Sequence, residues 1–156
     1  MATNQTSVTN RLLHLTSNDW ALISSKAQRQ IFNMGEVIIR QGSLGDKLYI
    51  IRRGEAAVEL AGTTSRAVLA TLGPEDICGD MAFLEKSQTT AAVVANSDKV
   101  EADEIKGEDL RELFEAFPRL ASRFYQSLAI VLARRLRDTS RALAQEIAAK
   151  KRNRLD

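Results

Sequence analysis

The side chains most often used for nucleophilic and metal chemistry are rare in this chain. It has one histidine, His14, and one cysteine, Cys78. Zinc and iron–sulfur sites need more ligands of this kind than one chain can supply here, so we expect no metal site. A lone histidine gives no basis for a Ser/His/Asp triad. His14 is instead predicted to pack, partly buried, among the leucines beside it, and the chain is not expected to be an enzyme.

Two hydroxyl residues, Thr139 and Ser140, hold positions that could do chemistry of another kind. At about 100° per residue along a helix, Ser140 lies on an apolar stripe between Leu136 and Leu143, with Thr139 at its edge. Hydroxyl groups buried in such a stripe need hydrogen-bond partners. They either contact a ligand or bond back to carbonyls of their own helix, and periodicity leaves both alternatives open.

A long helix must position these hydroxyls. Proline disfavours helix at the residue before it and suits a first helical position, so a short helix should end near Phe117 and a second begin at Pro118. With no later Gly or Pro, the second helix is predicted over residues 118–151, followed by a basic tail at 152–156. At 1.5 Å per residue it is about 50 Å long, so part of it must project from a domain of this size.

The predicted helix has two apolar faces. One should pack on the rest of the domain and consists of Leu120, Phe124, Leu128 and Val131. The other lies on a different side and consists of Ala129, Leu132, Leu136, Leu143 and Ile147. An apolar stripe that extends beyond its own domain needs a partner, and parallel self-association is the simplest. We therefore predict a homodimer through this seam; the alternative is a helix folded back on its own domain.

The middle of the chain, residues 31–105, has the pattern of short β-strands. Leu48 and Ile50 alternate with Tyr49 and Ile51, which is typical of a half-buried strand. Short strands at this spacing, each ended by turn residues, indicate a sandwich or barrel. The turn signals include Met34-Gly35, Gly45-Asp46, Gly54, Gly62-Thr63-Thr64 and Gly73-Pro74. Before the strands, Thr16 to Asp19 forms a capping-box-like pattern that predicts a short helix.

Composition fits one globular domain. The chain has 156 residues, of which 44% are hydrophobic and 27% charged. A net charge of +2 is too small for wholesale nucleic-acid binding. The basic run at 150–154 is typical of a solvated helix end, with contact to an acidic or membrane partner as the alternative. Residues 1–10 are predicted to be a flexible leader without an export signal, and no apolar run reaches the ~18 residues of a membrane span. We expect a cytoplasmic chain.

The stretch from Met34 to Leu60, M-G-E-V-I-I-R-Q-G-S-L-G-D-K-L-Y-I-I-R-R-G-E-A-A-V-E-L, resembles the opening strands of a known family. This is the cyclic nucleotide-binding domain family, which includes catabolite activator protein and the regulatory subunits of cyclic-AMP-dependent kinase. The resemblance covers about residues 12–144. It implies a mainly β fold, an eight-stranded jelly-roll β-barrel with flanking short helices over 11–117, and a nucleotide held inside the barrel.

The family's phosphate-binding cassette is matched by the segment that begins at Cys78. By this resemblance Gly79 lets the backbone approach closely, and the amides of a short helix through Asp80, Met81 and Ala82 face an anion. Asp80 stands where the family has a glutamate that binds the ribose 2′-hydroxyl. It can accept the same hydrogen bond but reaches one methylene less.

The family's phosphate-binding arginine has no counterpart here. Its position falls on Thr89 or Thr90, followed by Ala91, and neither threonine carries charge. A bidentate arginine–phosphate contact is the strongest polar interaction of such a site. Its replacement by a neutral hydroxyl should cost about 1.5–3 kcal/mol, or about 10- to 150-fold in affinity.

The segment A-R-R-L-R-D-T-S at 133–140 is similar to the dimer helix of catabolite activator protein. In that helix a Thr-Ser pair contacts the purine, one residue from each subunit. The resemblance therefore implies that Thr139 and Ser140 face a purine. That protein continues into a helix-turn-helix domain, whereas this sequence ends about where such a domain would begin, so direct sequence-specific DNA binding is not expected.

Together these features predict a dimeric sensor that binds a cyclic nucleotide, cyclic AMP or cyclic GMP, and signals through its long helix to another protein. Two alternatives remain open. One is a dimeric scaffold that has lost nucleotide binding, which the missing arginine favours. The other is a barrel that takes a different ligand, such as cyclic di-GMP or a less charged molecule.

Overall fold

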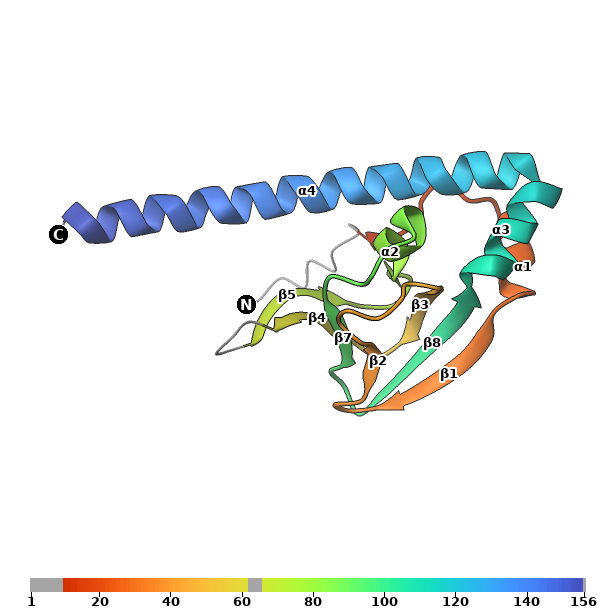
Figure 1. Ribbon diagram of the computed structural model, residues 1–156, viewed down its shortest axis with the longest axis horizontal. Helices are drawn as coiled ribbons and strands as arrows, with labels where there is room; N and C mark the ends of the chain where they lie inside the picture. Colours follow the sequence, from red (N-terminus) through yellow and green to blue (C-terminus); the bar gives the residue numbers. More distant parts are fainter. Residues whose placement is uncertain (1–9, 62–65, 156) are drawn as a thin grey trace.

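The computed structural model describes residues 10–61 and 66–155, and its fold is mainly β with a long C-terminal helix (Figure 1). Two four-stranded antiparallel sheets form, with strand orders β1-β8-β3-β6 and β2-β7-β4-β5. This confirms the predicted eight-stranded jelly roll. The predicted turn at 62–64 and leader residues 1–9 lie outside the described residues. The strands are β1 (Gln28–Asn33), β2 (Val37–Ile39), β3 (Lys47–Arg53), β4 (Ala56–Ala61), β5 (Arg66–Leu72), β6 (Ile77–Cys78), β7 (Ala92–Ala95) and β8 (Lys99–Lys106).

Strand β3 of the β1-β8-β3-β6 sheet is buried on both faces. On one face, Leu48 and Ile50 of β3 join a core cluster with the helices. On the other face, Tyr49 and Ile51 join a second cluster between the two sheets. The prediction of a half-buried β3 is therefore wrong, because a helical layer covers the side that an isolated two-sheet sandwich would leave open to solvent.

Helix α1 (Ser17–Ser24) begins with the predicted capping box. The Asp19 N–H donates to Thr16 Oγ1 at 3.1 Å, and the Thr16 N–H donates to Asp19 Oδ2 at 3.0 Å. The buried Asp19 carboxylate also accepts two hydrogen bonds, of 2.6 and 2.8 Å, from Arg123 of the long helix. The Arg123 hydrogen bonds are the largest influence on the pKa of Asp19, which falls to about 2. This ion pair ties the N-terminal helix to the C-terminal one.

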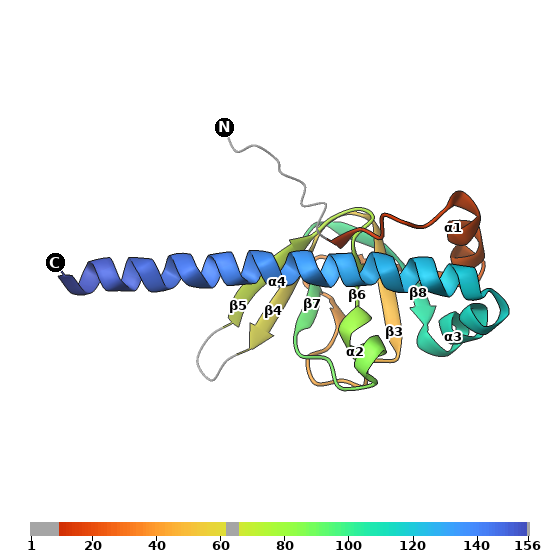
Figure 2. The same cartoon turned by 90° about the horizontal axis from the view of Figure 1, so that it is seen from above.

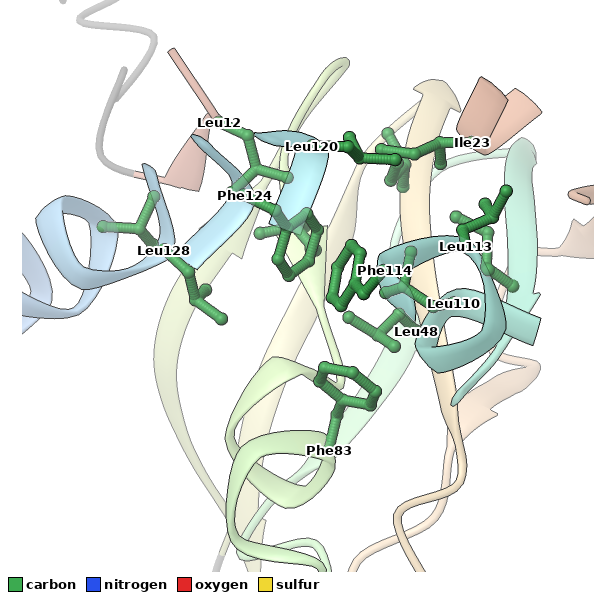
Figure 3. Packing of buried hydrophobic residues seen from close by; sticks show 14 residues of the cluster. Leu12, Ile23, Leu48, Phe83, Leu110, Leu113, Phe114, Leu120, Phe124 and Leu128 are labelled. Atoms are coloured by element: carbon green, nitrogen blue, oxygen red, sulfur yellow. The ribbon is translucent and has the colours of Figure 1, made fainter. Parts of the chain in front are cut away.

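Three further helices follow: α2 (Asp80–Glu85), α3 (Gly107–Ala116) and α4 (Pro118–Leu155). The predicted break at Phe117 and restart at Pro118 are confirmed. An aromatic cluster joins all three helices in the core (Figure 3). The Phe124 ring of α4 lies 5.0 Å from Phe114 of α3 and 6.5 Å from Phe83 of α2, measured between centroids. The Phe124 ring of α4 therefore packs near aromatic rings of both α2 and α3.

Helix α4 packs on the domain with its first half and projects beyond it with its second (Figures 1 and 2). The predicted packing face is confirmed, since Leu120, Phe124, Leu128 and Val131 are all buried. Every residue from 136 to 155 is exposed, and the helix continues to Leu155, four residues beyond its predicted end. The segment predicted as a basic tail is thus helical up to that residue.

The segment before α1 runs against α4. Asn10, the last residue of the predicted leader, and Leu12 are both buried. His14 is exposed, and the prediction that it packs partly buried is wrong. Its backbone N–H donates at 3.0 Å to the buried hydroxyl of Ser127 on α4.

Candidate ligand-binding site

The second residue of the cassette segment, Gly79, is a glycine that the fold requires. Gly79 is the N-cap residue of α2 and has φ +83°, a backbone angle that residues with a side chain rarely adopt. A Cβ at this position would lie 2.4 Å from the Lys47 carbonyl oxygen of β3. Gly79 therefore packs closely against the neighbouring strand β3, and its predicted close approach to a ligand stays a prediction.

Asp80, the predicted ribose acceptor, is 2% exposed and forms an ion pair with Arg135 of α4. Arg135 Nη1 donates to Asp80 Oδ2 at 2.8 Å, and Nη2 donates to Oδ1 at 3.3 Å. Arg135 Nη2 also donates to the Ile77 carbonyl at 3.1 Å, and Nε donates to the side chain of Asn10. A single guanidinium thus joins the cassette, the N-terminal segment and α4.

Sequence reasoning missed Arg135 as a functional residue. A usable signal was present, because the helical period places Arg135 on the same side of α4 as the buried Leu128 and Val131. A cation on a buried helix face needs an anionic partner. The identity of that partner, 55 residues away in sequence, could not be read from periodicity.

Thr89, one of the two positions that match the family arginine, connects two loops. Its Oγ1 donates to the Arg40 carbonyl at 2.6 Å and accepts from the Ser43 N–H at 3.1 Å. Its backbone adds hydrogen bonds with Gly42 and Ser43, both of 2.8 Å. The hydroxyl proton of Thr89 is used inside the protein. Thr90 is exposed, and Ala91 is half-buried.

The remaining cassette residues divide into a buried and an exposed side of α2. Ala82 is buried beneath the loop at Gly45, where an added Cβ would lie 1.9 Å from the Ala82 Cβ. Met81 is 45% exposed. Burial raises the pKa of the neighbouring Cys78 thiol above its usual range, so Cys78 stays protonated and unreactive. The cysteine of this segment is therefore not an activated nucleophile.

A sequence profile described as "Cyclic nucleotide-binding domain" matches residues 29–117, more than half of the chain. The chain belongs to the cyclic nucleotide-binding domain family. The jelly-roll fold and the family membership predicted from the sequence are both confirmed, and the domain is therefore of the regulatory sensor type.

Two relatives of this cyclic nucleotide-binding domain have ligands in their names. Cyclic GMP-binding protein C of Dictyostelium discoideum is 35% identical over 130 residues, covering 78% of this chain and 5% of that protein. The cyclic AMP receptor protein of Thermus thermophilus is 34% identical over 120 residues, covering 75% of this chain and 52% of that protein. The domain thus spans about half, or far less, of the length of these relatives.

Solved structures show the same architecture. The crystal structure of Thermus thermophilus catabolite activator protein has a TM-score of 0.72 and 32% identity, and the match covers 86% of this chain and 62% of that one. A cyclic nucleotide-binding domain from Methylobacillus flagellatus has a TM-score of 0.78, with 90% of this chain and 81% of that one covered. At 20% identity the second likeness shows the fold alone.

Two cavities of the domain lie away from the cassette. One, of about 450 Å³, lies between α1 and the α3–α4 corner, beside Leu22, Phe117 and Arg123. The other, of about 280 Å³, is lined by residues of β2, β4 and β7 together with Arg40 and Gln41. Neither of the two includes Asp80, Thr89 or Thr90 in its lining.

The two residues predicted to face a purine and most of the predicted dimer seam lie on the projecting part of α4. Thr139 and Ser140 are exposed, one turn beyond Arg135. Leu136, Leu143 and Ile147 are 69%, 56% and 49% exposed. Ala129 is also exposed, whereas Leu132 is half-buried and packs against the core. Within the described residues, no helix combines the length and apolarity needed to cross a bilayer, and no cluster of three metal-ligating side chains occurs.

Proposed function

We propose that this chain is a dimeric sensor module in which a cyclic nucleotide bound at the cassette alters the arrangement of α4 and so signals to a partner protein. The observation that carries the proposal is the ion pair between Asp80 and Arg135. Because this pair joins the ligand cassette to the output helix, a ligand that contacts Asp80 must bind some positions of α4 more tightly than others.

The proposed ligand contacts follow the order of the cassette. Asp80 accepts from the ribose hydroxyl beside Arg135, and the phosphate lies on the first-turn amides of α2 and the exposed Thr90 hydroxyl. The purine reaches Thr139 and Ser140, one turn along α4. Cyclic AMP is the first candidate because a relative is named a cyclic AMP receptor protein, and cyclic GMP the second because another is named a cyclic GMP-binding protein.

The proposed dimer uses the exposed apolar seam of α4. Two copies would cover Leu136, Leu143 and Ile147, which the single chain leaves about half exposed or more. Sedimentation should show a dimer that Leu136→Glu/Leu143→Glu dissociates. The control places the same two glutamates at Gln145 and Ala148, off the seam, and should stay dimeric. A double seam variant that remains a dimer would refute this interface.

Calorimetric titration with cyclic AMP, cyclic GMP and cyclic di-GMP tests the ligand. Saturable heat with a mononucleotide below about 100 µM supports the sensor, since that range allows for the missing arginine. Thr139→Ala/Ser140→Ala should reduce this affinity without loss of fold, because both residues are exposed. Asp98→Ala, an exposed change in the β7–β8 turn, is the matched control.

A second candidate function is a dimeric scaffold that binds no nucleotide. It is favoured by one feature of the cassette: the polar groups of Asp80 and Thr89 already have partners inside the protein. The guanidinium of Arg135, the cation closest to Asp80, is neutralised by that carboxylate. Flat titrations with all three nucleotides, from a chain that still sediments as a dimer, would select the scaffold.

A further inference from the structure

The charged residues are distributed unevenly along the chain, although its net charge is only +2. The projecting part of α4, residues 136–155, holds six Lys or Arg and two Asp or Glu, for a net charge of +4. The other 136 residues hold sixteen cations against eighteen anions, for a net charge of −2. All residues of the projecting part are exposed, so its charge faces solvent. Residues 136–155, called the rod below, are about 30 Å long.

By helical periodicity, the side chains of residues 134–155 fall on three faces of α4. The face toward the domain continues from Phe124 and Val131, and the seam contains Leu136 and Leu143. A third face lies about 110–130° from each of them. We call it the arginine face, and it spans an arc of about 80°: Arg134, Arg137, Arg141, Ala144, Ala148 and Arg152. Arg134 is half-buried and the other five residues are exposed, and the proposed dimer does not cover this face.

We propose that the arginine face is a docking surface for an acidic α-helix of a partner protein, which deepens the proposed signalling through α4 and rests on it. Each guanidinium can bind a carboxylate in bidentate fashion. The spacing of Arg134, Arg137 and Arg141 matches carboxylates at positions i, i+3 and i+7 of a helix laid alongside. The charge of the rod would also steer an acidic partner toward it.

The alanines favour a protein helix over a nucleic acid as the partner. Ala144 and Ala148 separate the cationic residues at either end of the face, and small side chains let two helix axes approach to about 8 Å. A partner helix can cover this apolar gap with its own side chains, whereas a phosphate backbone cannot. Across the proposed dimer, the two arginine faces point away from the seam, so each dimer offers two docking surfaces.

Fluorescence anisotropy of the full chain with three labelled probes tests the proposal. The first probe is a Glu/Ala helical peptide of about 20 residues with glutamates at i, i+3 and i+7. The others are a duplex DNA of about 20 base pairs and phosphatidylserine vesicles. We expect the peptide to bind at an ionic strength of about 0.05 M and to weaken as salt rises, and a lysine version of the peptide not to bind.

Two triple variants test whether the peptide binds at the arginine face. Arg134→Gln/Arg137→Gln/Arg141→Gln should weaken peptide binding about tenfold, from the loss of three contacts between a guanidinium and a carboxylate at the protein surface. Lys26→Gln/Arg53→Gln/Lys99→Gln removes the same charge from exposed sites on the barrel and should change binding less than about twofold. Equal effects of the two triple variants would overturn the proposal. So would tighter binding of DNA or vesicles than of the peptide at equal salt, or no peptide binding at all.

The outcome can be separated from that of the sensor proposal. Arg134→Gln/Arg137→Gln/Arg141→Gln keeps Asp80, Arg135 and the seam, so its cyclic AMP titration and its sedimentation should match those of the unaltered chain. A flat cyclic AMP titration together with arginine-dependent peptide binding would refute the sensor and leave the docking surface standing.

Discussion

The ion pair between Asp80 and Arg135 gives the sharpest test of how the cassette and α4 are joined. Arg135→Met removes the guanidinium and leaves an unbranched apolar side chain in place of its aliphatic part. Asp80 is 2% exposed, so the change leaves a buried carboxylate without its partner. Removal of one member of a buried pair costs about 3–5 kcal/mol. With a urea m-value of about 2 kcal/mol/M, the unfolding midpoint should fall by about 1.5–2.5 M.

Removal of the other partner, the Asp80 carboxylate, should lower the free energy of unfolding by less. In Asp80→Leu the guanidinium of Arg135 is 26% exposed and keeps its contacts to Ile77 and Asn10, so we expect a loss of about 1–2 kcal/mol. The double variant Asp80→Leu/Arg135→Met removes both charges. It should be less destabilised than the sum of the single variants, by about 2 kcal/mol or more.

The assay is urea unfolding of all four proteins at one fixed protein concentration, because a dimer's apparent stability depends on concentration. Additive effects, or a loss below about 0.5 kcal/mol for Arg135→Met, would refute the buried-pair reasoning. A change in m rather than in the midpoint would indicate altered compactness instead, so both parameters are needed.

Three further outcomes are expected. Asp19→Asn should destabilise the domain by about 2 kcal/mol at pH 7. Because the pKa of Asp19 in the folded state is lowered to about 2, this stabilisation is present above about pH 4 and is lost as the pH falls toward 2. Urea unfolding at several pH values measures this profile, which the exposed change Asp98→Asn should not reproduce. Gly45→Ala should cost about 1–3 kcal/mol, because its Cβ would overlap Ala82, whereas Gly73→Ala, with nothing within 4 Å, should have little effect on the thermal midpoint. Thr89→Arg should strengthen cyclic AMP binding about tenfold or more in calorimetry, because it adds a guanidinium that can bind the phosphate. It should also loosen the loop at Ser43, whose backbone N–H would lose its bond to the Thr89 hydroxyl. Unchanged affinity would show that the phosphate does not lie beside Thr89.

Local patterns in the sequence determined much of the architecture. The capping box at Thr16, the break at Phe117-Pro118 and the packing face of α4 are all properties of residues within a few positions of one another. Such features depend on short-range sterics and hydrogen bonds, which act before any tertiary contact forms. The family was indicated by the resemblance of the stretch from Met34 to Leu60 to its known members.

Only the tertiary structure decided which groups meet. The partner of Asp80 is Arg135, 55 residues away, and the hydroxyl of Thr89 is taken by Arg40, 49 residues away. Burial of both faces of β3 arises because a helical layer covers the sheet, which no strand pattern encodes. Periodicity specifies which way a side chain points along its own element, whereas the packing of distant elements selects its partner. That long-range packing links the cassette to α4.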